Sequence, residues 1–305
     1  MLSLQVRLLE LYFRLQHALA PGSGKIDMRK ERAELDGLGA MFKLPKGIQV
    51  VKEIADGVPA EWLIPSGVSA GRVVLYLHGG SYVAGSINSH RSLAANIAIA
   101  SKARALIIDY RLAPEHPHPA AVEDAVTAYQ WLLNNQADPR HLAVVGDSAG
   151  GGLTLALLIS LRDGKIPLPA AGVCLSPWTD LAFSGESWKG KAAVDLVIYA
   201  YKELEFARMY LGGLDAKTPL ASPLYADLKG LPPLLVQVGT DEVLLSDSTR
   251  LVDRARQAGV DAVLDEWKSM QHVWQFAASF IPEGRLAIAR IGEFIDRYVP
   301  VPGSP

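Results

Sequence analysis

Cysteine is almost absent from the chain, since its 305 residues include only Cys174. A single cysteine cannot form an intrachain disulfide, and zinc sites built from several cysteines are excluded as well. The chain also lacks an apolar run of the roughly 18 residues that a membrane span needs. We therefore expect no stable membrane span, and we find no cluster of residues that predicts a metal site.

Neither sign of charge is in excess, because 30 Lys and Arg residues stand against 32 Asp and Glu residues. A protein that binds nucleic acid needs a basic face, so nucleic acid is not expected as a partner. Half of the residues are hydrophobic, which excludes disorder for most of the chain. The length favours one large α/β unit that carries an insertion or a cap.

The first 20 residues resemble a signal peptide only superficially, because charged residues interrupt the apolar run that such a leader needs. Four leucines recur there at helical spacing: Leu4, Leu8, Leu11 and Leu15. The spacing predicts an amphipathic helix. This helix packs on the protein's own surface or, as the alternative, lies in a membrane interface. Without a signal peptide, we expect a cytoplasmic protein.

Short, continuously apolar runs predict strands that are buried on both faces, as in a parallel sheet. These runs occupy residues 60–64, 71–77, 105–109, 142–145, 172–175, 234–238 and 262–267. Helical patterns lie between or after them, at residues 91–100, 120–134, 150–161, 248–258 and 285–298. The alternation predicts an open βαβ sheet flanked by helices.

One connection is too long for a simple crossover, because about 58 residues separate the strand at 172–175 from the strand at 234–238. It contains its own helical pattern at 192–210. We expect a lid there, over the carboxyl ends of the strands where open α/β sheets bind ligands. The predicted organisation is N-terminal cap helices at 1–45, a catalytic α/β domain at 46–180 and 216–305, and a cap insertion at 181–215.

The segment Gly146–Gly150 fits the pattern G-x-S-x-G. A predicted strand leads directly into it and a predicted helix follows, which is the context in which such a serine is exposed as a nucleophile. The alternative is a glycine-rich turn that binds phosphate. The segment lacks the Lys-Ser/Thr ending and the G-x-G-x-x-G frame of such turns. We therefore predict that Ser148 is a nucleophile.

A serine hydroxyl needs a base, and the base in turn needs an orienting carboxylate. Where the nucleophile sits on such a turn, the acid and then the histidine follow it along the chain. Six of the seven histidines precede Ser148, so His272 is the predicted base. Asp241 closes the strand at 234–238 and is the predicted acid, with Glu242 and Asp247 as rivals.

The segment His78–Tyr82 ends the predicted strand at 71–77. Its small residues allow backbone N–H groups to turn toward a developing oxyanion. We predict an oxyanion hole formed by Gly79, Gly80 and Ser81 together with Ala149, the residue after the nucleophile.

Three segments together resemble the bacterial hormone-sensitive-lipase-like (family IV) esterases of the α/β-hydrolase fold: His78–Ser81, Asp109–Glu115 and Gly146–Gly151. The similarity covers roughly residues 45–299. It implies a mostly parallel eight-stranded sheet with flanking helices and a helical cap, and hydrolysis of carboxylic esters without a cofactor. The chain departs from the family's His-Gly-Gly-Gly pattern at Ser81, which puts the backbone conformation at that position in question.

The expected activity is that of a serine carboxylesterase, acting on short- to medium-chain esters through an acyl-enzyme. The same machinery serves lactone and arylformamide hydrolases, and the fold also occurs as a non-catalytic ligand receptor. Aromatic side chains are expected to line a pocket for the small-molecule ester: Tyr82, Trp188, Tyr201 and Phe206. An edge strand at 262–267 offers a surface through which two copies could pair as a homodimer.

Overall fold

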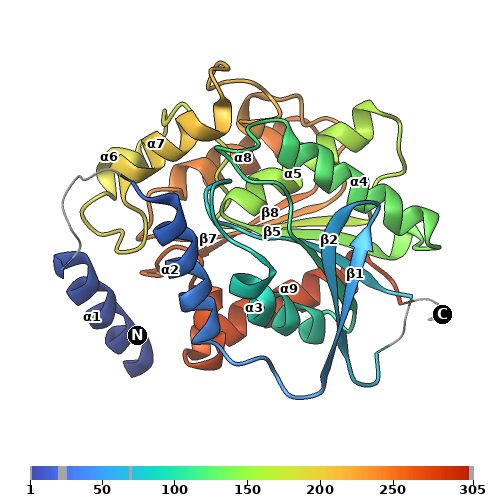
Figure 1. Cartoon of the computed structure of the whole chain (residues 1–305), viewed down its shortest axis with the longest axis horizontal. Coiled ribbons are helices and arrows are strands. Elements are labelled where there is room, and N and C mark those ends of the chain that lie inside the picture. The colour runs from blue at the N-terminus through green and yellow to red at the C-terminus, as the bar shows by residue number, and fades with distance from the viewer. Residues whose placement is uncertain (1, 20–25, 69–70, 302–305) are drawn as a thin grey trace.

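The computed structural model describes residues 2–19, 26–68 and 71–301. Its centre is an eight-stranded sheet in the order β1-β2-β4-β3-β5-β6-β7-β8 (Figure 1). The strands are β1 (Ile48–Ala55), β2 (Val58–Pro65), β3 (Val73–Leu77), β4 (Arg104–Ile108), β5 (Leu142–Asp147), β6 (Ala171–Leu175), β7 (Leu234–Gly239) and β8 (Ala262–Trp267). The helices are α1 (Leu4–Leu19), α2 (Met28–Ala40), α3 (Ile87–Ala100), α4 (Ala120–Asn134), α5 (Ala149–Asp163), α6 (Ser187–Gly190), α7 (Ala200–Leu211), α8 (Leu245–Gln257) and α9 (Pro282–Tyr298).

Six of the strands, β3 to β8, pair in parallel, whereas β1 and β2 pair antiparallel with their neighbours. Leu77 at the end of β3 pairs with Gly146 near the end of β5. The loops after the parallel strands therefore meet at one edge of the sheet, where folds of this kind place their ligands. The α/β fold with a mostly parallel eight-stranded sheet is confirmed.

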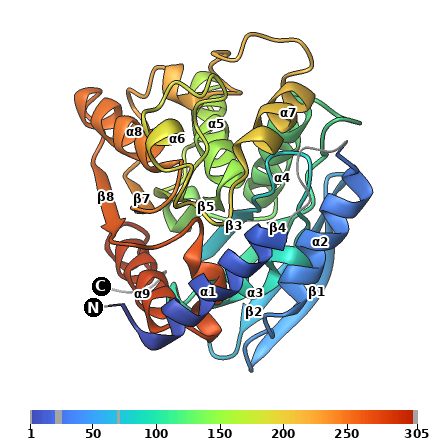
Figure 2. The same ribbon diagram turned by 90° about the vertical axis from the view of Figure 1, so that its left-hand side faces the viewer.

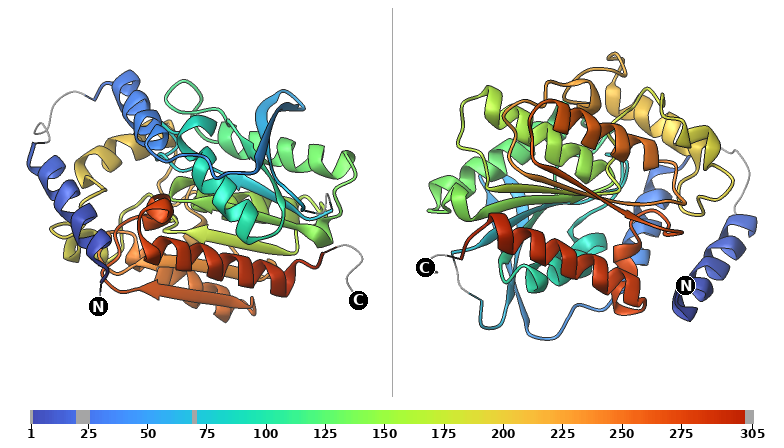
Figure 3. Two further views of the ribbon diagram at one scale, coloured as in Figure 1. Left: turned by 90° about the horizontal axis from the view of Figure 1, so that it is seen from below. Right: turned by 180° about the vertical axis from the view of Figure 1, so that it is seen from behind.

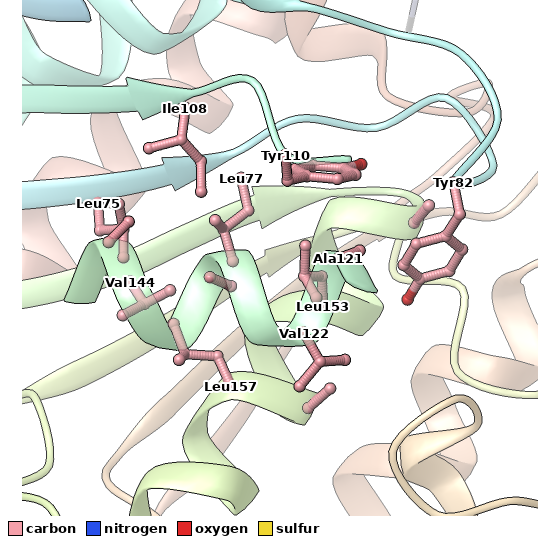
Figure 4. Close-up of a cluster of buried hydrophobic side chains, with 14 of the residues drawn as sticks. Leu75, Leu77, Tyr82, Ile108, Tyr110, Ala121, Val122, Val144, Leu153 and Leu157 are labelled. Carbon is pink, nitrogen blue, oxygen red and sulfur yellow. The ribbon is translucent and has the colours of Figure 1, made fainter. Parts of the chain in front are cut away.

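Alternate residues of a strand point to opposite faces of the sheet, and both faces are buried here. In β3, Leu75 and Leu77 belong to the core that packs on α4 and α5, and Val74 and Tyr76 belong to the core on the opposite face. Figure 4 shows Leu75 and Leu77 among the side chains of the first core. Figure 3 shows α9 on one side of the sheet and α8 on the other. The sheet is thus a rigid support between two helical layers.

All seven predicted strands are present, and β1 was missed. The predicted helix at 192–210 is wrong in its first half, since α7 begins only at Ala200. The physical reason is Asp195, whose carboxylate accepts the N–H groups of Val197 and Ile198 at 2.9 Å each. A side chain that binds the nearby backbone in this way competes with helical hydrogen bonds. β8 lies at the sheet edge as expected, and its pairing with a second copy stays a prediction.

Helices α1, α2, α6 and α7 gather at one side of the sheet, where the predicted cap helices belong (Figure 2). The leucine stripe of α1 does not pack inward, because Leu4 and Leu8 are 69% and 50% exposed. The helix packs instead through Val6 and Leu9, which contact a cluster around Trp274. Within the described ranges, no helix combines the length and the hydropathy that a membrane crossing requires.

Candidate functional site

Ser148 lies on a sharp turn between β5 and α5, with backbone angles φ 53° and ψ −121°. A non-glycine residue adopts such a conformation only where the surroundings enforce it. Two backbone hydrogen bonds do so, from the Ser148 N–H to the carbonyl of Leu175 and from the N–H of Trp178 to the carbonyl of Ser148. Gly150 is required because a Cβ there would lie 2.0 Å from the carbonyl oxygen of Leu77. This is the geometry expected of an exposed nucleophile.

His272 lies in the loop after β8 and lines the same cavity as Ser148. Its Nδ1 atom is 2.7 Å from Oε2 of Glu242, and both side chains are buried. A carboxylate on Nδ1 fixes the tautomer of the ring, so Nε2 becomes the nitrogen that is able to accept a proton.

The prediction of Asp241 as the acid is wrong. Its N–H donates to the carbonyl of Met270, and its carboxylate points away from His272 to lie 3.6 Å from Nζ of Lys191. The next residue, Glu242, makes the contact with His272 instead. Consecutive residues of the loop after β7 point in different directions, and the longer glutamate side chain spans the distance back to the histidine.

Glu242 is fixed from two sides, because its Oε1 accepts the Ser176 hydroxyl at 2.8 Å and the Gly239 N–H at 2.6 Å. A Cβ on Gly239 would lie 2.1 Å from the carbonyl oxygen of Met270, so the loop with the acid touches the loop with the histidine. The other rival, Asp247, accepts backbone N–H groups of the segment after β6 and does not contact His272.

Burial by itself lowers the pKa of His272. The hydrogen bond and the negative charge of Glu242 outweigh this effect, with a further contribution from Asp195, and the pKa lies above its ordinary value of 6.5. The ring is therefore a stronger base than a free imidazole, which suits a group that takes a proton from a hydroxyl.

The loop of residues 79–84, which we call the oxyanion loop, follows β3 and lies over the serine. Its first residue does not fit the prediction, because the Gly79 N–H already donates to Asp147 Oδ1 and His90 Nε2 at 3.2 Å each. In the described part of the chain, the N–H groups of Gly80, Ser81 and Ala149 have no protein acceptor. These three remain the candidate oxyanion donors.

Ser81 stands where the family pattern has a glycine, and its φ is 54°. The backbone at Ser81 adopts the left-handed conformation that glycine favours, and this conformation is strained for a residue with a Cβ. The side chain of Ser81 lies near the carboxyl group of Glu203 on α7. Burial raises the pKa of Glu203 to about 7, and the polar side chain of Ser81 reduces this shift.

Asp147, which was not among the residues predicted from the sequence, holds the start of the oxyanion loop. Asp147 accepts the Tyr76 hydroxyl at 2.7 Å as well as the Gly79 N–H. Burial acts to raise the pKa of Asp147, but the nearby His90 and the Tyr76 hydroxyl outweigh it, so the pKa lies below its ordinary value. An ionised Asp147 is the acceptor that the Gly79 N–H needs. The position of Asp147 inside the Gly146–Gly150 motif was the signal in the sequence that could have indicated this role.

The cavity above the serine has a volume of about 350 Å³. Its apolar walls come from α1, α2, α7 and the loop after β8 and include Leu9, Phe13, Leu35, Leu38, Phe206 and Phe276. Of the four aromatic residues predicted for the pocket, only Phe206 lines it. Tyr82 is fully buried and stacks on Tyr210, Trp188 packs against Phe183, and Tyr201 is exposed.

Among the described residues, no group of three or more His, Cys, Asp or Glu side chains is arranged to hold a metal ion. Cys174 is buried within β6 and forms no disulfide. The polar residues that line the cavity include Ser148, His272 and Glu203.

Comparison with known proteins agrees with the fold. The family described as alpha/beta hydrolase fold matches residues 74–276. An acetyl-hydrolase of Streptomyces hygroscopicus is 48% identical over 236 residues, covering 77% of this chain and 79% of that protein. An esterase of Acinetobacter venetianus is 34% identical over 86% of this chain and 87% of its own length.

Solved structures are similar over almost the whole chain. A crystal structure of an esterase from the bacterial hormone-sensitive lipase family is 47% identical with a TM-score of 0.93, covering 97% of this chain and 99% of that chain. A structure of EstE5 soaked by p-nitrophenyl butyrate is 45% identical with the same TM-score and the same coverage.

Proposed function

Since the chain belongs to the bacterial hormone-sensitive-lipase family of α/β-hydrolase esterases and is a carboxylic ester hydrolase, we propose that it works through an acyl-enzyme formed on Ser148. His272 is the general base and acid, and Glu242 is the carboxylate that orients it. The observation that carries the proposal is the 2.7 Å contact between His272 Nδ1 and Glu242 Oε2, beside the cavity that the strained Ser148 also lines.

In the acylation half, Ser148 Oγ attacks the ester carbonyl carbon while His272 Nε2 takes the hydroxyl proton. The carbonyl oxygen becomes an oxyanion, which the N–H groups of Gly80, Ser81 and Ala149 stabilise. Protonated His272 then gives its proton to the alcohol oxygen as the C–O bond breaks. The alcohol leaves, and the acyl group stays on Ser148.

In the deacylation half, a water molecule takes the place of the alcohol. His272 accepts one of its protons, and the resulting hydroxide adds to the acyl carbon. The same N–H groups stabilise the second oxyanion. His272 returns the proton to Ser148 Oγ, and the carboxylic acid is released.

The cavity supports short- to medium-chain esters as substrates. Its volume of about 350 Å³ and its apolar walls suit an acyl chain of a few carbon atoms. Because α1, α2 and α7 supply part of these walls, we assign residues 1–45 and 181–215 to a cap that bounds the substrate.

The direct test is hydrolysis of p-nitrophenyl butyrate by the purified protein and by Ser148→Ala. We expect kcat/KM of the variant to fall at least about a thousandfold, because the acyl-enzyme cannot form. A variant whose kcat/KM stays within tenfold of the parent would remove Ser148 from the mechanism.

p-Nitrophenyl acetate, butyrate and decanoate, assayed in parallel, test the chain-length preference, with decanoate expected to be the poorest substrate.

A further inference from the structure

The oxyanion loop adopts a strained conformation. Gly80, Ser81 and Tyr82 have φ values of 115°, 54° and 63° in succession, and two of these residues are not glycines. Side chains with a Cβ rarely adopt this region, and such a conformation persists only where neighbouring groups enforce it. The contacts that hold the loop therefore determine whether the N–H groups of Gly80 and Ser81 point toward an oxyanion.

Several of these contacts come from helices that lie over the cavity. The Tyr82 ring stacks on Tyr210 of α7, with ring centroids 3.7 Å apart and an interplanar angle of 2°. Ser81 also lies near Glu203 of α7, because its side chain acts to lower the pKa of that carboxyl group. The α/β domain adds the N–H of Ala113, which donates to the carbonyl of Tyr82 at 2.9 Å.

Helix α2 contacts the oxyanion loop through Arg32, which donates several hydrogen bonds. Its Nε donates to the carbonyl oxygen of Val83 at 2.8 Å, and its Nη2 donates to the carbonyl oxygen of Ala113 at 3.0 Å. The guanidinium also pairs with the Glu115 carboxylate, at 3.0 Å and 2.6 Å. Only a planar group with several fixed donors makes these contacts at once. Arg32 thus joins the oxyanion loop to the segment that precedes α4.

Helix α2 is itself docked by contacts that do not involve the oxyanion loop. Asp36 accepts the hydroxyl of Ser86 at 2.6 Å, and Glu31 pairs with Lys202 of α7 at 2.7 Å. The position of Arg32 therefore depends on how α2 and α7 sit on the α/β domain.

We propose that Arg32 is a positioning residue that holds the oxyanion loop in its strained conformation and so makes the oxyanion hole depend on the docking of α2. The proposal rests on the proposed function, because it assigns Arg32 a role in the same transition state. Arg32 acts through the backbone of the loop and does not touch the reacting atoms.

The test compares Arg32→Ala with Arg29→Ala, which removes an exposed arginine from the same helix. For p-nitrophenyl butyrate we expect Arg32→Ala to lower kcat about 10- to 100-fold with KM within about threefold, because a displaced donor weakens only the transition state. Arg29→Ala should stay within twofold of the parent in both constants. Equal losses in the two variants, or a parental kcat in a folded Arg32→Ala, would overturn the proposal.

A second readout separates positioning from general stability. A trifluoromethyl ketone adds to the serine and needs the oxyanion hole, whereas the matching methyl ketone does not. We expect Arg32→Ala to weaken the binding of the trifluoromethyl ketone only, by about the same factor by which kcat/KM falls. We also expect millimolar guanidinium to restore part of the activity of Arg32→Ala, compared with sodium at equal ionic strength. If the binding of both ketones weakens equally, or guanidinium restores no activity, Arg32 has only a structural role.

If Arg32→Ala does not fold, Arg32→Lys carries the test, because lysine keeps the charge but has no planar fork. A reduced kcat with an unchanged KM supports the proposal, and a parental kcat overturns it. A parent enzyme that does not bind the trifluoromethyl ketone would instead overturn the proposed function of Ser148, so the two failures are distinguishable.

Discussion

Glu242 and Asp241 are neighbours in the chain, but their side chains face different surroundings. Glu242 is fully buried between Ser176 and His272, whereas Asp241 is partly exposed beside Lys191. A buried carboxylate with three hydrogen-bond donors is held in one orientation, which a group that orients an imidazole requires. This difference assigns the orienting role to Glu242 and predicts that the two acids respond differently to removal of their charge.

We therefore expect Glu242→Gln to lower kcat/KM for p-nitrophenyl butyrate about 10³- to 10⁴-fold, and the matched Asp241→Asn to change it by less than about threefold. His272 must be neutral to act as a base, and Glu242 raises its pKa. Removal of the carboxylate lowers that pKa, so the acid limb of the kcat/KM profile should move to lower pH in Glu242→Gln. The assignment is wrong if Asp241→Asn shows the large loss, or if the acid limb of Glu242→Gln stays in place.

That Ser148 and His272 line one cavity was predictable from the sequence, because a motif marks the serine and the order along the chain marks the histidine. Ser148 lies in a motif between a strand and a helix, and His272 is the only histidine that follows it. The acid was not predictable, because the loop after β7 has no periodicity that tells which side chain turns inward. The donation of the Gly79 N–H to Asp147 was missed, although Asp147 lies inside the Gly146–Gly150 motif.

Among the secondary-structure elements, the buried strands were predictable and the exposed strand β1 was not. β1 is exposed at most of its residues and contains Lys52 and Glu53, so it has no continuous apolar run. The turn Asp56–Gly57, where both residues have positive φ, is the signal that could have revealed the hairpin. In the cap, Asp195 binds the backbone ahead of it and delays the start of α7, which helical spacing alone could not show.

Helix α2 contains two glycines that differ in their surroundings. A Cβ on Gly39 would lie 2.3 Å from the backbone oxygen of Ser89 in α3, whereas a Cβ on Gly37 would meet nothing within 4 Å. The close approach at Gly39 is what allows α2 to pack on α3.

We expect Gly39→Ala to destabilise the protein by about 1–3 kcal/mol, because the two helices must separate. Gly37→Ala should stabilise α2 by up to about 1 kcal/mol, since alanine is the better helix former. Urea denaturation followed by circular dichroism measures both free energies of unfolding. If Arg32 acts as proposed, kcat should fall only in Gly39→Ala. Equal effects of the two substitutions would contradict the packing of α2 on α3.

The whole molecule builds its cavity from segments that are far apart in the sequence. Leu9 and Phe13 come from α1, Phe206 from α7 and Phe276 from the loop after β8. A prediction of the pocket from aromatic residues alone therefore failed for three of its four members. The fold class was predictable because it follows from the alternation of strands and helices, whereas the walls of the cavity follow from how the cap sits on the sheet.

The proposed mechanism requires that one serine of the folded chain becomes covalently modified with the help of His272. The most direct measurement is the intact mass of the protein after reaction with diethyl p-nitrophenyl phosphate, followed by peptide mapping. We predict one diethylphosphoryl group per chain on Ser148, complete loss of esterase activity, no adduct in Ser148→Ala and at least about a hundredfold slower labelling in His272→Ala. Full inactivation with the adduct on another residue, or unchanged activity in a protein fully modified at Ser148, would exclude Ser148 as the nucleophile.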